Sequence, residues 1–102
     1  MKINEIIFND ELTLSLSGSL TTDTAPKLEV IIKKHISNIN SLVFDLSELD
    51  YTTSAGLRVF LASHKLLSGN MKIKNANDEI IKIFKMTGLI NIFNIEQKAL
   101  RG

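Results

Sequence analysis

The sequence has 102 residues, of which 44% are hydrophobic, 12 are Lys or Arg, 11 are Asp or Glu and none is Cys. This length predicts a single domain over residues 1–102, and the missing cysteines exclude a disulfide framework and thiolate metal sites. A net charge of +1 without a basic stripe argues against nucleic acid as a partner, and the absence of ~18 consecutive apolar residues argues against membrane insertion, so we expect a cytoplasmic protein.

The first two predicted elements are strands that form a hairpin. Leu12, Leu14 and Leu16 alternate with hydroxyl-bearing residues between Glu11 and Ser19, which is the pattern of a strand buried on one face. A shorter apolar run precedes them from Ile3 to Phe8. Asn9 and Asp10 between the two runs supply the residues of a tight turn.

A helix is predicted next, beginning at Ala25 and Pro26, because proline is tolerated in a first helical turn. Its apolar residues recur at helical spacing as far as Asn38 to Asn40; they are Leu28, Ile31, Ile32, Ile36 and Ile39.

The run from Leu42 to Leu46 predicts a central strand, since it is apolar and too short for a helix. The polar residues from Ser47 to Thr53 are interpreted as a connection. A second helix is predicted from Ser54, and Ser68-Gly69-Asn70 ends it.

The remaining elements are a strand from Met71 to Asn75, a helix that starts at Asn77 and ends at Gly88, and a last strand within Ile90 to Ile95. The predicted order is therefore ββαβαβαβ. It describes an α/β fold with a small mixed sheet of four to five strands and helices mainly on one face.

Catalytic and cofactor chemistry finds little support in the sequence. The only imidazoles, His35 and His64, are far apart and belong to no metal-binding motif, and the dispersed glycines form no phosphate-binding loop, so we expect no metal and no cofactor. Ser54-Ala55-Gly56 partly matches the nucleophile elbow of hydrolases, but Thr52 stands where glycine is needed and no histidine follows a suitable acid. We therefore do not expect an enzyme.

Ser54 itself has two interpretations. Its hydroxyl is suited to capping the helix, which is worth about 1 kcal/mol. Alternatively, the hydroxyls and small residues around it create a helix start at which a phosphate would be tolerated.

Three segments resemble one family, the STAS domain, and within it the stand-alone anti-sigma factor antagonists of bacteria. Leu42 to Leu57 resembles the family's hydrophobic strand, its "DLS" and aromatic, and its D-S-[SA]-G-L phosphorylation motif. Gly18-Ser19-Leu20, followed by Thr24-Ala25 and Leu28, resembles the family's entry to the first helix. Phe84 to Leu89 resembles the F-x-[ML]-[ST]-G-L segment that closes the third helix.

The resemblance implies a regulatory binding module. In such antagonists a partner that is both anti-sigma factor and serine kinase phosphorylates the serine that matches Ser54. The unphosphorylated form binds that partner, and a PP2C-type phosphatase resets the switch. Because Thr53 stands where phosphorylatable members usually have Asp, Thr53 and Thr52 are secondary candidates for phosphorylation.

The predicted partner surface surrounds this helix start. Its candidate residues are Ser19, Thr21, Thr22, Asp23, Thr53, Ser54, Ala55, Gly56 and Arg58. The alternative is a constitutive STAS adaptor, a subunit of a transporter or signalling assembly that works without a phosphoswitch.

Overall fold

A computed structural model describes residues 1–97 and contains one five-stranded sheet in the order β1-β2-β3-β4-β5. β1 and β2 are antiparallel, whereas β3, β4 and β5 continue parallel to β2. The strands are β1 (Lys2–Phe8), β2 (Glu11–Leu20), β3 (Ser41–Thr52), β4 (Met71–Lys74) and β5 (Asn94–Glu96). The predicted α/β class and the order of elements are confirmed.

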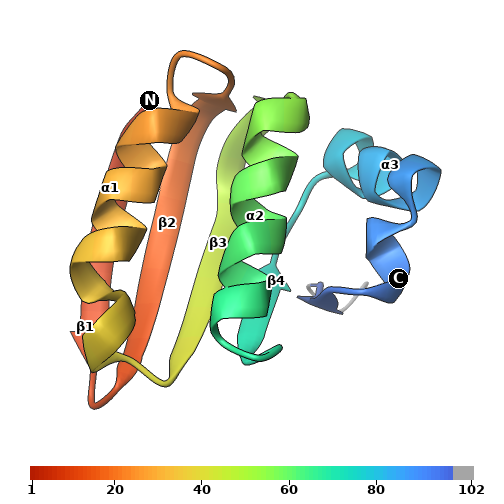
Figure 1. Cartoon of the computed structure of the whole chain (residues 1–102). Helices are drawn as coiled ribbons and strands as arrows, with labels where there is room; N and C mark the ends of the chain where they lie inside the picture. Colours follow the sequence, from red (N-terminus) through yellow and green to blue (C-terminus); the bar gives the residue numbers. More distant parts are fainter. Residues whose placement is uncertain (98–102) are drawn as a thin grey trace.

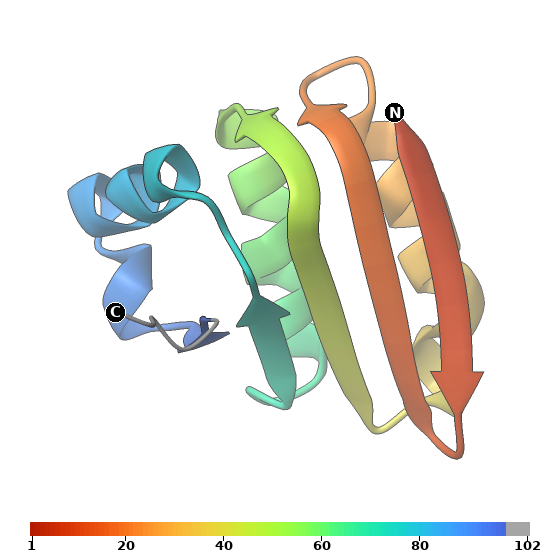
Figure 2. The same ribbon diagram turned by 180° about the vertical axis from the view of Figure 1, so that it is seen from behind.

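Three α-helices accompany the sheet: α1 (Ala25–His35), α2 (Ser54–Leu66) and α3 (Asp78–Thr87). Figure 1 shows α1 and α2 side by side on one face of the sheet, and Figure 2 shows the opposite face without a helix. α3 lies beyond β4, at the far side of the sheet from β1. No helix within residues 1–97 has the length and apolarity required to span a membrane.

The hydrophobic core lies between the sheet and α1 and α2. The alternating leucines of β2 are fully buried toward the helices, as their spacing predicts. The ring of Phe44 on β3 packs edge-on against Phe60 of α2, with centroids 4.8 Å apart. Phe84 of α3 extends the same aromatic cluster, with its centroid 6.4 Å from that of Phe60. Edge-to-face packing of this kind is a favourable arrangement of aromatic rings.

β3 is longer than predicted, because residues 47–52 continue the strand instead of forming a connection. Pairing with β2 continues through two register shifts: Ser17 lies opposite Glu48 after the first, and Leu20 lies opposite Thr52 after the second. The bulges alter the alternation of the strand, so that Leu49 and Thr52 are buried while the residues between them are exposed. Residues 47–52 therefore have a polar sequence because they belong to a bulged strand that exposes most of them, and not because they form a loop.

Two other boundaries differ from the predictions. α1 ends at His35, and a 3₁₀ turn, η1 (Ile36–Asn38), replaces its expected last turn. The final apolar segment is divided between a second 3₁₀ turn, η2 (Leu89–Asn91), and the short strand β5. Gly88 ends α3 as predicted, in the left-handed conformation with a φ of 80°.

Candidate functional site

The candidate site lies where β3 passes directly into α2. Thr53 is the N-cap of this helix, with extended backbone angles, and Ser54 is its first residue. The interpretation of Ser54 as the capping residue is therefore wrong: the chain turns one residue earlier than the serine. Ser54 is exposed to solvent.

The two threonines before Ser54 direct their hydroxyls into the protein. Thr52 is only 1% exposed, and its Oγ1 donates to the carbonyl oxygen of Thr53 over 3.1 Å. The Oγ1 of Thr53 is also buried but has no hydrogen-bond partner. Of Thr52, Thr53 and Ser54, only Ser54 is exposed to solvent.

Gly56 allows the first turn of α2 to pack closely on the sheet. A Cβ atom at this position would lie 2.2 Å from Thr52 Oγ1 and 2.6 Å from Leu20 Cδ2. Both distances are too short for real atoms, so a side chain here would displace the helix start. Because Gly56 has no side chain, the first turn of α2, which carries Ser54, can pack directly on the ends of β2 and β3.

The loop between β2 and α1 forms the neighbouring part of the surface. Thr24 Oγ1 accepts from the backbone N–H of Thr21 and donates to the carbonyl oxygen of Ser19. Thr24 is the N-cap of α1, but its side chain makes no capping bond because its hydroxyl is hydrogen-bonded to the loop residues Ser19 and Thr21. These bonds hold the loop in one shape, with Thr22 and Asp23 exposed at its tip.

The start of α3 is attached to the same end of the sheet. Asn77 caps α3 by accepting from Ile80 N–H over 2.8 Å, as predicted. Its Nδ2 also donates to the carbonyl oxygens of Leu49 and Asp50, each 3.2 Å away. Three segments therefore converge here, and each brings exposed carboxylates: Asp23, Asp50, Asp78 and Glu79.

The structure brings the predicted loop residues to the strand end that supports Ser54, since Ser19 lies opposite Tyr51 in the register of β2 and β3. Ala55 is half-buried and Gly56 buried, so they lie beneath the surface. Arg58 is exposed one helical turn beyond Ser54.

Tyr51 is a residue of this surface that sequence reasoning missed. Its side chain is 47% exposed beside the loop. Its aromatic character could have drawn attention to it, because tyrosine is enriched in protein interfaces.

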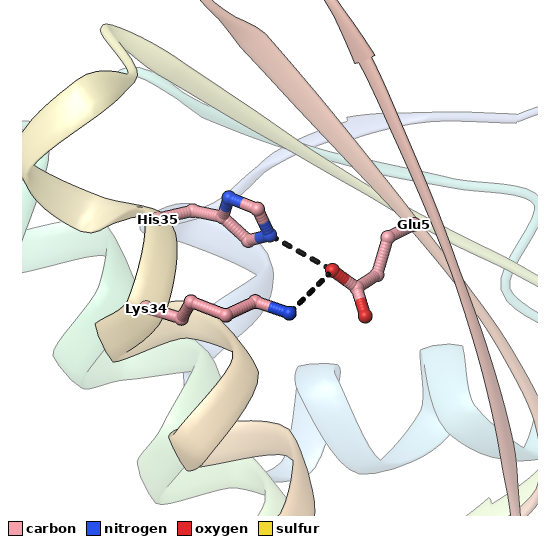
Figure 3. A network of polar contacts seen from close by, with 3 residues as sticks. All are labelled: Glu5, Lys34 and His35. Atoms are coloured by element: carbon pink, nitrogen blue, oxygen red, sulfur yellow. Dashed lines mark hydrogen bonds and ion pairs between the residues drawn. The ribbon is translucent and has the colours of Figure 1, made fainter.

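The two histidines lie away from this surface. The ring of His64 packs against Phe93, with centroids 5.9 Å apart, and His35 lies 2.8 Å from the carboxylate of Glu5 (Figure 3). Within residues 1–97, no group of three or more His, Asp or Glu side chains has a metal-binding arrangement.

Comparisons with known proteins agree with this architecture. The chain is 27% identical to an anti-sigma-B factor antagonist of Bacillus subtilis, over 100% of this chain and 98% of the relative. It is 28% identical to the anti-sigma-B factor antagonist of Listeria monocytogenes, over 85% of this chain and 80% of the relative.

Solved structures of low sequence identity share the fold. An anti-sigma factor antagonist from Mycobacterium paratuberculosis matches with a TM-score of 0.84 and 23% identity, over 93% of this chain and 84% of that one. The Bacillus cell fate determinant SpoIIAA in its phosphorylated form matches with a TM-score of 0.77 and 15% identity, over 96% of this chain and 92% of that one. The family model of the STAS domain matches residues 2–99, and this chain belongs to that family.

Proposed function

We propose that this protein is an anti-sigma factor antagonist whose binding is controlled by phosphorylation of Ser54. The observation that carries the proposal is the exposure of Ser54 on the first turn of α2 while the hydroxyl oxygens of Thr52 and Thr53 are buried. A kinase would reach the serine without unfolding the segment, whereas either threonine would first have to rotate outward. Ser54 is therefore the proposed acceptor, and the two threonines are disfavoured.

The names of the similar proteins support this function. Relatives called anti-sigma-B factor antagonists align over most or all of the chain. SpoIIAA has been solved in both unphosphorylated and phosphorylated forms, and each matches this chain with a TM-score of 0.77. Both forms therefore share the fold of this chain.

The physical basis of the switch is local charge. Phosphorylation adds roughly −1.5 to −2 charges and three acceptor oxygens at Ser54. The start of a helix tolerates this anion in the free protein. In a complex the same group would be buried against the partner and lose its hydration, which costs several kcal/mol for an unpaired charge. Each ~1.4 kcal/mol of this penalty weakens binding tenfold.

The proposed partner is an anti-sigma factor that is also a serine kinase, with a PP2C-type phosphatase restoring the serine. Its proposed docking surface comprises the loop residues Ser19, Thr21, Thr22 and Asp23 together with the helix-start residues Thr53, Ser54 and Arg58. Ala55 and Gly56 support this surface from beneath. On this proposal the protein is a cytoplasmic binding module and not an enzyme.

The test is phosphorylation by the candidate kinase. The purified chain is incubated with the kinase and ATP, and its intact mass and phosphopeptides are measured beside those of Ser54→Ala. One added phosphoryl group that maps to Ser54 and is missing from the variant is the expected result. Stable binding to the kinase without any phosphoryl transfer would contradict the switch and favour the constitutive adaptor.

A further inference from the structure

Thr53, the residue directly before Ser54, has a side-chain hydroxyl that makes no hydrogen bond. Within residues 1–97, its Oγ1 is the one buried side-chain nitrogen or oxygen that has no hydrogen-bond partner. Buried polar side-chain atoms are nearly always hydrogen-bonded in folded proteins, and a buried hydroxyl that is left unpaired lowers stability. This hydroxyl is therefore available to an acceptor that the unmodified chain does not offer it.

The backbone of Thr53, in contrast, is held on both sides. Its N–H donates to the carbonyl oxygen of Leu20 over 2.9 Å. Its carbonyl oxygen accepts from Thr52 Oγ1 over 3.1 Å and from the backbone N–H of Gly56 over 3.0 Å. These bonds fix the Cα atom of Thr53 beside Ser54, so the hydroxyl moves chiefly by rotation about the Cα–Cβ bond.

The start of α2 also lacks a side-chain cap. A threonine at the N-cap ordinarily accepts from an N–H group of the first turn, but the side chain of Thr53 makes no such bond. α3 is capped by Asn77 and carries Asp78 and Glu79 in its first turn. The first turn of α2 contains no acidic residue. The partial positive charge at the start of α2 is therefore not balanced by an anionic side chain in its own first turn.

We propose that, once Ser54 is phosphorylated, the hydroxyl of Thr53 turns outward and donates a hydrogen bond to the phosphate, so that Thr53 is a positioning residue of the switch. This depends on the proposed phosphorylation of Ser54. Rotation between staggered positions can bring the methyl group of threonine to the place that its oxygen occupied. The buried polar atom is then exchanged for an apolar one. The hydroxyl gains a charged acceptor, and hydrogen bonds to charged groups are the stronger kind.

The bond gives Thr53 an effect on the phosphorylated form alone, because Ser54 carries no charge before phosphorylation. A hydrogen bond to the doubly ionised phosphate favours that ionised form, so the second pKa of the phosphoserine should fall below its ordinary value of about 6. Near neutral pH the phosphate then carries a charge closer to about −2. Thr53 would in this way make the loss of partner binding more complete.

The test uses the full chain with phosphoserine incorporated at residue 54 during synthesis, so that it does not require the kinase. Titration followed by ³¹P NMR measures the pKa of the phosphate. Thr53→Val has the same shape as the native residue but no donor, and should lower the acid dissociation constant at least about threefold. Thr53→Ser keeps the donor and should restore the native value. Thr53→Asp should raise the pKa further than Thr53→Val, because a carboxylate beside the phosphate opposes its second negative charge.

Unfolding of the same variants separates this bond from an ordinary structural role. Thr53→Val should leave the folding equilibrium constant of the unmodified chain unchanged or slightly raised, but should lower that of the phosphorylated chain about fivefold or more. Equal phosphate pKa values in the native and Thr53→Val chains, or an equal effect of Thr53→Val on both forms, would overturn the role of Thr53 and leave the proposed function standing. Failure of the kinase to modify Ser54 would instead overturn the proposed function.

Discussion

The backbone N–H of Thr53 donates a hydrogen bond to the carbonyl oxygen of Leu20, with the two atoms 2.9 Å apart. This bond joins the end of β2 to the N-cap of α2, so the loop after β2 and the first turn of α2 form one surface. Leu20 and Thr52 are both buried beneath it. Ser54 therefore lies above closely packed, buried residues. Substitutions that disturb this packing should change the position of the serine side chain.

Gly56→Ala tests the effect of this packing on stability and binding. The added methyl group would overlap Thr52 Oγ1 and Leu20, so the variant should lose about 1–3 kcal/mol of unfolding free energy. Urea denaturation monitored by circular dichroism measures the loss, and binding to the anti-sigma partner should weaken as the helix start shifts. Ser54→Ala is the matched control at an exposed neighbour and should leave stability within about 0.5 kcal/mol of the native value.

Substitutions at the N-caps of α3 and α2, Asn77 and Thr53, should differ in their effect on the free energy of unfolding. Asn77→Ala should cost about 0.5–2 kcal/mol, because its side chain accepts from Ile80 N–H. Thr53→Val should be neutral or slightly stabilising, because the buried Oγ1 that it removes has no hydrogen-bond partner. Chemical denaturation of both variants measures the difference. A loss at Thr53→Val as large as that at Asn77→Ala would show that the threonine hydroxyl does cap α2 in solution.

The fold and the region of the site were predictable because their signals are local. Alternating leucines identified β2, and Asn77 and Gly88 identified the two ends of α3. The length of β3 was not predictable, because its second half is held by pairing with β2 through bulges, and such pairing depends on residues distant in sequence. The identity of the cap of α2 depended on the same strand, since its extension through Thr52 moves the turn to Thr53.

The contacts of His35 illustrate the same limit. Its place near the end of α1 was evident from spacing, but its partner, Glu5, lies thirty residues earlier and meets it only because β1 pairs beside β2. Tyr51 was missed for a related reason. The polar residues around it predict a connection, and the exposed and buried residues of a bulged strand do not alternate regularly.

Glu5 predicts a dependence of stability on acid pH. The hydrogen bond from His35, and the ion pair with Lys34, hold the pKa of Glu5 below its ordinary value of 4.5. A carboxylate whose pKa is lowered by folding stabilises the protein above its unfolded pKa, and this stabilisation disappears as the pH falls through the lower, folded value.

Glu5→Gln should therefore be less stable than the native chain by at most about 1 kcal/mol near neutral pH, since the pair is partly exposed. The difference between the two proteins should diminish as the pH falls below 4.5. Thermal or urea unfolding of both proteins over a series of pH values measures it. A difference that grows as the pH falls further below 4.5 would contradict the assigned contacts.

Control of binding by Ser54 is tested most directly by the dissociation constant of the complex with the anti-sigma factor, measured by titration calorimetry for four forms of the chain. These are the unmodified protein, the protein phosphorylated at Ser54, Ser54→Ala and Ser54→Asp. We expect Ser54→Ala to bind like the unmodified protein, and the phosphorylated and aspartate forms to bind at least about tenfold more weakly. Equal affinity for all four forms would contradict control of binding by Ser54.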